Sequence, residues 1–402
     1  MDSIKKVIQL IVDDGVFGPV KLKSVNFREK DEAHVSHFAS SIVGVAVTVE
    51  NDSSECIHRL IVKLPVNSDL IKELLMSDVL FKNEVLMYEE LLPLLKAQEL
   101  DVFPKMYYGN FTEGKETSRD MIILEDLSPG GFTLTEEKVF MDFNHFSLAL
   151  EKLGRFHALS HKTKRENAQE FRRLYGQLSK SKFENEKVPD IQKISCTAMQ
   201  RGIKHVMEKG DKLELLNQLL EKTNGLKAMV EKLFEPEEPF AVLCHGDFNR
   251  NNVFFKYENG KPVDVKFFDL QTPRYTTPSL DLAFILYMNT TKELREKHWD
   301  DMLRCYWDGF TAVLTELPFD FDQFHRHFAK TAIYGYIPCS FFLPYMMEPN
   351  PLPLQSMENL DTEAKVKMMM AIGGETATET IGDVVQHLLD KGYIEAFLHL
   401  YD

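Results

Sequence analysis

Two runs of apolar and β-branched residues dominate the first part of the chain. They extend from Val35 to Val49 and from Cys56 to Leu64, and the polar turn Asn51-Asp52-Ser53-Ser54 separates them. Runs of this kind on either side of a polar turn are typical of adjacent strands. A shorter apolar stretch, Val7 to Val12, ends at Asp13. It is too short for a secretory signal and predicts an amphipathic helix.

A helix is predicted after the second strand. Apolar residues recur with the helical period between Ser77 and Leu92, and Pro93 is expected to close this helix. A further apolar run, Met121 to Leu124, is soon followed by the cluster Ser128-Pro129-Gly130-Gly131. Such a Pro/Gly cluster is the best candidate in this chain for a linker between domains.

Beyond this linker the pattern becomes largely helical. Phe146 to His161 predicts one amphipathic helix, and residues 162–235 are rich in Lys, Glu and Gln, which is typical of exposed helices. The chain should therefore form an α+β fold with two lobes. We expect a small N-lobe, residues 1–126, with an antiparallel sheet and one helix. The large C-lobe, residues 127–402, should be mainly helical.

Two short strands interrupt the helical part and form a predicted hairpin. They span residues 253–257 and 263–268, and the dipeptide Asn259-Gly260 lies in the turn between them. Asn-Gly between apolar runs is a strong hairpin signal. Centring the turn on this dipeptide pairs Asn252 with Phe267, so both lie at the open end of the hairpin.

Candidate chemistry gathers at this open end. Asp269, two residues past the strand partner of Asn252, should be its diagonal neighbour at roughly 7–8 Å or less. An amide oxygen and a carboxylate that converge there suit Mg²⁺. Asp247 lies five residues before Asn252. This is the Asp-x-x-x-x-Asn spacing of kinase catalytic loops, in which Asp accepts a hydroxyl proton and Asn holds magnesium. Asp269 opens the triplet Asp269-Leu270-Gln271, which lacks the usual glycine.

A lysine and an acid for the phosphates are predicted upstream. Lys63 lies near the end of the second strand, and Glu84 lies near the apolar face of the following helix. A carboxylate near an apolar face needs a partner, and Lys63 is the candidate. The simpler alternatives are a solvated lysine and a surface acid. The loop that would cover the phosphates, residues 36–41, has no glycine, so its backbone and the hydroxyls of Ser40 and Ser41 are the candidate ligands.

Two spacings favour a small-molecule substrate. Asp281 follows Asp269 by only twelve residues, which leaves no room for a platform that binds a peptide. In addition, His245 lies 84 positions after His161, near the end of the predicted helix. An insertion of this length suits a pocket for a small molecule, so no peptide substrate is expected.

Composition excludes several classes of partner. The 402 residues carry a formal net charge of −15 at pH 7, which argues against binding to nucleic acid. The five cysteines are scattered, without a CxxC pair, as expected for a reduced, cytoplasmic protein. The longest apolar stretch, Ala332 to Met347, contains two prolines and falls short of a membrane span, so no membrane association is expected.

Several motifs resemble a known superfamily. His245-Gly246-Asp247 with Asn252, then Phe268-Asp269-Leu270-Gln271 and Asp281-Leu282-Ala283, resemble the aminoglycoside phosphotransferase and choline kinase superfamily. More narrowly, the chain resembles the insect ecdysteroid kinase-like family, also called CHK kinase-like. Four further segments carry this narrower resemblance: Ile61 to Pro65, Phe81-x-x-Glu84-x-x-x-Tyr88, Leu124-Glu125-Asp126-Leu127 and Leu153 to Ser160.

The resemblance implies a two-lobed protein-kinase-like fold, ATP and Mg²⁺ as cofactors, and phosphorylation of a hydroxyl group on an ecdysteroid or another hydroxylated steroid or xenobiotic. It implies backbone contacts of Glu125 and Leu127 with adenine. It also implies structural support of the catalytic loop by Asp281, for which compensation of a helix dipole is the alternative. His245 should brace the same loop through its ring. A set of five residues carries over as the nucleotide and catalytic machinery: Lys63, Glu84, Asp247, Asn252 and Asp269.

Two other functions stay open. The first is a choline- or sugar-type kinase on the same fold, which would require a pocket for a different acceptor. The second is a pseudokinase that binds a ligand without turnover. Retention of Lys63, Asp247, Asn252 and Asp269 argues against the second, because a module without catalysis does not need all four.

Overall fold

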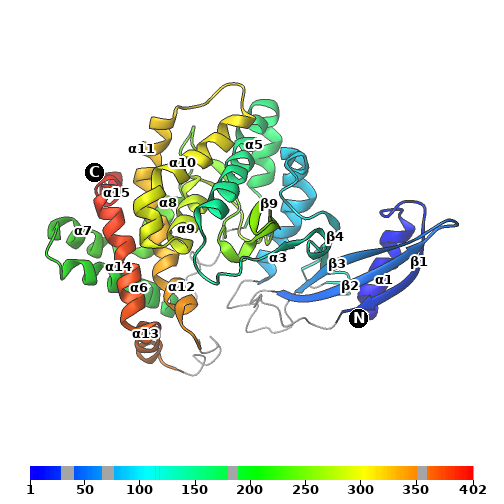
Figure 1. The fold of residues 1–402 in the computed structure, drawn as a ribbon, viewed down its shortest axis with the longest axis horizontal. Helices are drawn as coiled ribbons and strands as arrows, with labels where there is room; N and C mark the ends of the chain where they lie inside the picture. The colour runs from blue at the N-terminus through cyan, green and yellow to red at the C-terminus, as the bar shows by residue number, and fades with distance from the viewer. Residues whose placement is uncertain are drawn as a thin grey trace. The chain divides into compact units, whose positions relative to one another are not determined.

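The computed structural model describes residues 1–28, 40–65, 77–113, 115–116, 118–179, 189–350 and 360–401. The chain forms two compact units, each assembled from three segments (Figure 1). The sheet unit consists of Met1–Leu134, Asn167–Lys182 and Val253–Pro273. The helical unit consists of Thr135–Glu166, Phe183–Asn252 and Arg274–Asp402.

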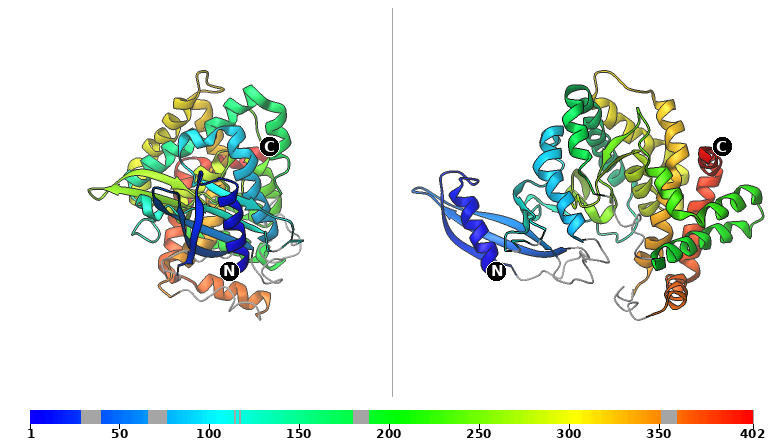
Figure 2. Two further views of the ribbon diagram at one scale, coloured as in Figure 1. Left: turned by 90° about the vertical axis from the view of Figure 1, so that its right-hand side faces the viewer. Right: turned by 180° about the vertical axis from the view of Figure 1, so that it is seen from behind.

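The sheet unit contains a five-stranded antiparallel sheet in the order β1-β2-β3-β5-β4 and a smaller sheet in the order β6-β8-β9. Helix α1 lies along β1–β3 (Figure 2) and buries Ile4, Ile8 and Ile11 against Val45 and Val47. The strands and the N-terminal helix have these bounds: α1 Asp2–Asp13, β1 Lys21–Phe27, β2 Ser40–Glu50, β3 Glu55–Pro65, β4 Met106–Asn110, β5 Met121–Glu125, β6 Phe132–Thr133, β8 Val253–Glu258 and β9 Lys261–Phe267.

The helix that follows β3 is longer than the sequence predicts. It begins as α3, Ser77–Leu86, passes through a π-helical turn at Met87–Leu91, and ends as α4, Leu92–Leu95. Pro93 does not close the helix. It lies just after the π-helical turn, where the regular i→i−4 hydrogen bonding is already interrupted, so its missing N–H is tolerated. The helix ends instead at Lys96, which has a left-handed backbone.

The β8–β9 hairpin forms as predicted, but its register differs by one residue. Phe267 pairs with Val253 and not with Asn252. The cause is a bulge opposite Lys256 and Tyr257, which leaves one extra residue, Val263, in β9. The turn itself is as predicted, since Asn259 and Gly260 both have positive φ, as a tight hairpin turn requires.

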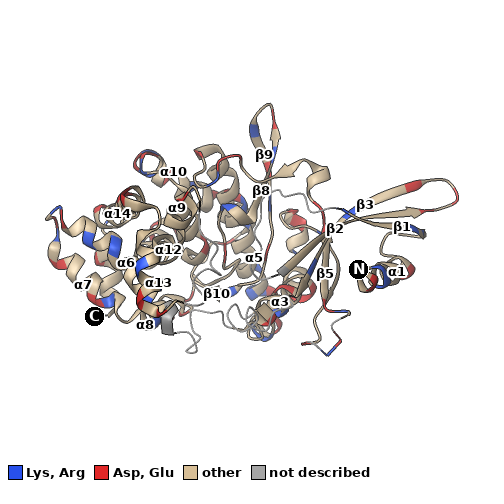
Figure 3. Cartoon of the chain, turned by 90° about the horizontal axis from the view of Figure 1, so that it is seen from below, with Lys and Arg blue, Asp and Glu red and all other residues tan. Residues whose placement is uncertain are grey.

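The described residues of the helical unit are mostly helical, and among them β7 and β10 form a two-stranded antiparallel pair. Acidic and basic residues both occur along α6, α7 and α8 (Figure 3). Its elements have these bounds: α6 Pro189–Met207, α7 Leu213–Thr223, α8 Leu226–Phe234, β7 Val242–Cys244, β10 Arg274–Thr276, α9 Ser279–Asn289, α10 Lys292–Val313, α11 Phe321–Thr331, α12 Tyr336–Met347, α13 Thr362–Ala371, α14 Gly374–Asp390 and α15 Tyr393–Leu398.

Helix α5, Phe143–Tyr175, extends well beyond the predicted end at His161. Asn167 has non-helical angles of φ −151° and ψ 51°. The boundary between the two compact units falls at the same residue. The part of α5 up to Glu166 therefore belongs to the helical unit.

Two glycines let α5 and α10 approach closely inside the helical unit. A Cβ added at Gly154 would lie 2.1 Å from the Tyr306 carbonyl oxygen, and one added at Gly309 would lie 1.9 Å from the Glu151 carbonyl oxygen. No side chain fits at either place, so the two backbones can touch. This contact brings α5 and α10 together near His157 and Tyr306, which are described below.

These elements confirm the predicted fold class, which is α+β with an antiparallel sheet and a helix in one part and mostly helices in the other. The expected lobe boundary after residue 126 stays a prediction. Within the described ranges, no helix has both the length and the apolar character that crossing a membrane requires. The apolar stretch 332–347 forms a short 3₁₀ turn and α12, and most of its side chains are buried.

Candidate active site

The loop after β7 presents the carboxylate of Asp247. Asn249 donates its side-chain amide to Asp247 Oδ1 at 2.8 Å, and Asn252 donates to Asp247 Oδ2 at 2.8 Å. Both amides also reach the main-chain oxygen of Asp247, at 3.2 and 2.8 Å. Each carboxylate oxygen thus has one amide donor, and the orientation of the carboxylate is fixed.

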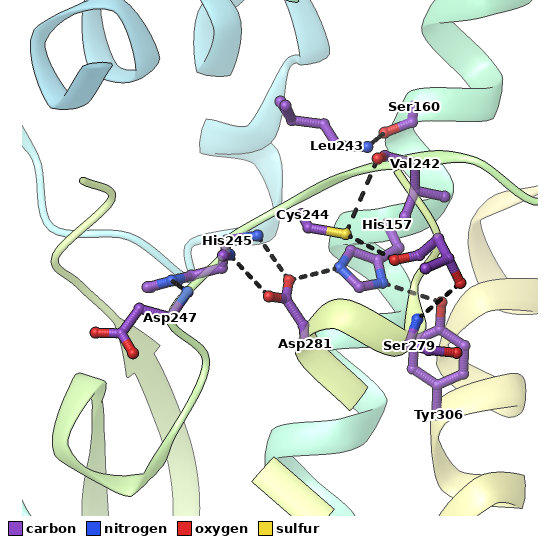
Figure 4. Close-up of polar contacts among 12 residues, drawn as sticks. His157, Ser160, Val242, Leu243, Cys244, His245, Asp247, Ser279, Asp281 and Tyr306 are labelled. Atoms are coloured by element: carbon purple, nitrogen blue, oxygen red, sulfur yellow. Dashed lines mark hydrogen bonds and ion pairs between the residues drawn. The ribbon is translucent and has the colours of Figure 1, made fainter. Parts of the chain in front are cut away.

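The backbone of this loop is fixed by Asp281, in the first turn of α9. Asp281 Oδ2 accepts the His245 N–H at 2.6 Å, and Oδ1 accepts the Gly246 N–H at 2.8 Å (Figure 4). Gly246 has φ +89°, which favours glycine at this position. The His245 ring is fully buried, and its Nδ1 accepts the Asp247 N–H at 3.4 Å. Asp281 therefore bonds the loop backbone as the resemblance implies, beyond any effect on the helix dipole.

Asp281 is itself held by side chains from two other helices. His157 Nε2 on α5 lies 3.0 Å from Asp281 Oδ2, and His157 Nδ1 lies 3.0 Å from the Tyr306 hydroxyl on α10 (Figure 4). All three side chains are buried. One turn further along α5, the Ser160 hydroxyl accepts the N–H of Leu243 in β7 at 2.9 Å. Three helices thus brace the strand and loop that lead to Asp247.

Within the described residues, one group of side chains lies close enough together to hold a metal ion. His157, Cys244 and Asp281 have ligand atoms within 4.8 Å of one another. Asp281 already accepts three hydrogen bonds, and Cys244 Sγ donates to the Thr277 carbonyl oxygen at 3.3 Å. Burial raises the pKa of the Cys244 thiol well above its usual range, which keeps the sulfur protonated. The group is therefore a hydrogen-bonded core and not a metal centre.

The sheet unit carries a second charged cluster. Lys63 Nζ lies 2.8 and 2.6 Å from the two carboxylate oxygens of Glu84 on α3, and 2.6 Å from Asp269 Oδ1. Glu84 is fully buried and Lys63 is nearly so. The predicted pairing of Lys63 with Glu84 is observed, and neither is a surface residue.

The three charges of this cluster affect one another. Burial alone lowers the pKa of Lys63, but the carboxylates of Asp269 and Glu84 outweigh it, and the net pKa is raised. Burial raises the pKa of Glu84 although the Lys63 ammonium opposes it. One ammonium between two carboxylates leaves an excess of negative charge, which suits a site that holds a cation.

Asp269 lies in a strained turn after β9. It has φ +69°, and its carbonyl oxygen accepts the Gln271 N–H at 2.9 Å. Non-glycine residues rarely adopt this conformation, and such outliers concentrate at functional sites. The end of β9 is anchored because Phe267 N–H donates to the Val102 carbonyl oxygen at 2.7 Å. The strand end and the turn are therefore set by the sheet unit itself.

The remaining nucleotide candidates lie at strand ends of the sheet unit. Ser40 and Ser41 begin β2, where they pair with Pro65 and Leu64 of β3, and residues 36–39 of the expected loop lie outside the described residues. Glu125 ends β5, and its N–H donates to the Lys105 carbonyl oxygen at 2.8 Å. The carbonyl oxygen of Leu127, two residues beyond the end of β5, accepts the N–H of Gly130 at 3.1 Å.

The candidate residues thus form two sets. The helical unit holds Asp247, Asn252, His245 and Asp281, and the sheet unit holds Lys63, Glu84, Asp269 and the two serines. Sequence reasoning missed Asn249, which lies two residues after Asp247. A signal for Asn249 existed in the three asparagines that crowd the segment 247–252.

Comparison with known families identifies the same family that the sequence motifs resemble. A family model described as ecdysteroid kinase-like matches residues 34–319, which is more than half of the chain. The chain belongs to the ecdysteroid kinase-like family. It is thus a member of a small-molecule kinase-like family. A comparison with curated proteins finds no match.

Solved structures resemble this ecdysteroid kinase-like chain at low identity. An ethanolamine kinase of Plasmodium vivax is 14% identical, covers 88% of this chain and 81% of its own, and has a TM-score of 0.40. A choline/ethanolamine kinase family protein of Mesorhizobium loti is 9% identical, with coverages of 96% and 99% and a TM-score of 0.35. The GDP complex of an aminoglycoside 2'-phosphotransferase-IIIa is 12% identical, with coverages of 94% and 99% and a TM-score of 0.39. Likenesses at this level say nothing of the substrate.

Proposed function

We propose that the protein is an ATP- and Mg²⁺-dependent kinase that phosphorylates a hydroxyl group of a small molecule. The presentation of Asp247, with an amide donor on each carboxylate oxygen, carries this proposal. A carboxylate held in this way on a short loop suits a general base for an alcohol. Membership of the ecdysteroid kinase-like family supports the same reaction.

In the proposed reaction, Asp247 accepts the proton of the acceptor hydroxyl. At the same time the oxygen of that hydroxyl attacks the γ-phosphorus of ATP. A new P–O bond forms to the acceptor, and the bond to the β-phosphate oxygen breaks and releases ADP. Asn249 and Asn252 keep the carboxylate aimed, and Asp281 keeps the loop backbone in place. General-base assistance of this kind is worth roughly 10²–10⁴-fold in rate.

The sheet unit supplies the proposed nucleotide contacts. Lys63 is the donor to the phosphates, and Glu84 holds its ammonium group in place. Ser40 and Ser41 are proposed to face the phosphates. The Glu125 N–H and the Leu127 carbonyl already have partners within the chain. The groups proposed to meet adenine are therefore the Glu125 carbonyl and the Leu127 N–H.

Asn252 and Asp269 are the proposed ligands of Mg²⁺. Both offer oxygen atoms, which this hard cation prefers. The amide nitrogen of Asn252 is engaged with Asp247, so its Oδ1 is the atom left for a cation. When bound, Mg²⁺ supplies positive charge to the phosphate oxygens. A chain with a net charge of −15 has particular need of such local charge to hold ATP.

The proposed acceptor is a hydroxylated steroid, such as an ecdysteroid, or another hydroxylated xenobiotic. The family match supports this choice of acceptor class. The test incubates the purified protein with labelled ATP, Mg²⁺ and a panel of ecdysteroids, other steroids, glycosides, sugars and choline. We expect label transfer to a steroid or xenobiotic hydroxyl, and none with Asp247→Asn. Transfer only to choline or a sugar would refute the acceptor class. Nucleotide binding without any transfer would refute the kinase activity.

A further inference from the structure

Gln271 occupies the place of the glycine in the usual Asp-Phe-Gly triplet, and in this structure its side chain has a specific partner. It is 7% exposed, and its Nε2 donates to Glu84 Oε2 at 3.3 Å. Lys63 Nζ contacts the same oxygen at 2.6 Å. Glu84 therefore receives one donor from the predicted phosphate-binding lysine and another from the turn that carries Asp269.

Asn83, the residue before Glu84 on α3, holds the main chain of the same turn. It is 1% exposed, and its Nδ2 donates to the Gln271 carbonyl oxygen at 3.3 Å. The same nitrogen donates to the Ser179 carbonyl oxygen at 3.1 Å, and Asn83 Oδ1 accepts the Ser179 N–H at 3.0 Å. Both donors and the oxygen of this buried amide are thus in use.

Two successive residues of α3 therefore hold Gln271 at both its side chain and its backbone. A glycine at position 271 would keep the contact with Asn83 but would lose the donor to Glu84. Asp269 lies two residues earlier and has a left-handed backbone that is rare for aspartate. Contacts from a rigid helix on the next residues are what such a strained turn needs in order to persist.

We propose that Asn83 and Gln271 form a clasp whose role is to position Asp269 and the Lys63–Glu84 pair in one fixed arrangement before the nucleotide binds. The clasp rests on the proposed kinase function and adds two positioning residues to it. Because both contacts come from within the sheet unit, this arrangement needs no separate activation step. The clasp also ties Ser179, which follows α5, to α3.

The test compares Asn83→Ala and Gln271→Met with Asp120→Ala in the otherwise unchanged full chain. Methionine matches glutamine in length and cannot donate a hydrogen bond. Asp120 is a buried control in the same unit, and its Oδ1 accepts the Thr112 N–H at 2.6 Å. The measurements are the Kd of MgADP by calorimetry, KM for ATP, kcat, and the thermal midpoint without ligand.

We expect each clasp variant to raise both the Kd of MgADP and the KM for ATP about tenfold, with kcat at saturating ATP much less affected. The double variant should lose less than the product of the two single effects, since the two contacts hold one turn. Asp120→Ala should lower the thermal midpoint and leave the KM unchanged. A clasp variant that lowers the thermal midpoint as the control does, with unchanged Kd and KM, would overturn the proposal.

A second measurement needs no nucleotide. In the protein without ligand, Asn83→Ala should speed hydrogen exchange at the Ser179 amide, which loses its acceptor, and at the Gln271 amide in the released turn. Unchanged exchange at both amides would overturn the clasp even if MgADP binds normally. A wild-type protein that binds no MgADP would instead overturn the proposed kinase function, and the exchange result would still decide whether the clasp exists.

Discussion

Asn252 donates its side-chain amide to both the main-chain oxygen and the carboxylate of Asp247, at 2.8 Å each. This contact assigns the two ends of the Asn252 amide. The nitrogen serves the proposed base, so the oxygen is the end that can serve a cation. The spacing in the sequence places Asp247 and Asn252 on one loop. At a separation of five positions, the Asn252 amide can reach the Asp247 carboxylate. The loop turns back so that Asn252 reaches the carboxylate from its own strand end.

Replacement of Asp247 by Asn tests the proposed base. The substitution keeps the size of the side chain and removes its ability to accept a proton from an alcohol. We expect kcat to fall by about 10²–10⁴-fold or more, with binding of MgATP largely unchanged. Steady-state kinetics and calorimetry on the same preparation measure the two effects. Unchanged turnover in this variant would refute the assignment of Asp247.

Replacement of Asp269 by Ala tests the proposed metal ligand. The variant loses a carboxylate that Lys63 contacts at 2.6 Å, so both the cation site and the charge balance around Lys63 change. We expect weaker binding of MgATP and a higher requirement for Mg²⁺, whereas binding of ATP in the presence of a chelator should change less. Titrations with and without Mg²⁺ give the comparison. A wild-type affinity for MgATP would rule out the metal role.

Replacement of Gly309 by Ala tests the contact between α5 and α10. The new Cβ would lie 1.9 Å from the Glu151 carbonyl oxygen, a backbone atom that a side-chain movement cannot relieve. We expect the free energy of unfolding to fall by about 3 kcal/mol or more, measured as a shift in the urea unfolding transition. Gly225→Ala is the matched control, because its nearest atom is 3.8 Å away. Equal stability of the two variants would contradict the close packing.

Local patterns predicted several elements of this fold because their causes are local. The hairpin turn at Asn259-Gly260 depends on positive φ, which glycine and asparagine signal in the sequence. The bulge at Val263 could not be predicted, since it depends on the strand ladder and not on the turn. The end of α5 at Tyr175 was missed because the helix continues past its kink at Asn167.

Some contacts of the candidate site could likewise be predicted from the sequence, and others could not. The pair of Lys63 with Glu84 could be predicted because a buried carboxylate needs a cation, and the sequence offers one in the right place. The clasp of Asn83 and Gln271 could not be predicted, since many backbone groups can form hydrogen bonds with a buried amide such as that of Asn83. Its partners Ser179 and Gln271 lie 96 and 188 residues away along the chain. Nothing in the local pattern indicates contacts of that range.

His161 gives the last prediction, which concerns stability and pH. Its ring lies edge-on to Phe310 and Phe319, and its Nε2 is buried without a hydrogen-bond partner in the described part of the chain. Burial, together with the positive charges of Lys164 and Arg165, lowers the pKa of His161 to about 3. The folded protein therefore keeps this ring neutral far below the usual histidine pKa of about 6.5.

The sign of the effect follows from proton uptake. Between about pH 6.5 and pH 3 the unfolded chain binds a proton at His161 and the folded chain does not, so stability falls as the pH falls through this window. The loss is up to about 1.4 kcal/mol per pH unit, or roughly 2 kcal/mol between pH 7 and pH 5. His161→Phe fits among the aromatic rings and should reduce the difference in unfolding free energy between these two pH values by that amount. His399→Gln, at an exposed position, should not. The same pH dependence in His161→Phe and the wild type would show that this histidine is not buried as a neutral ring.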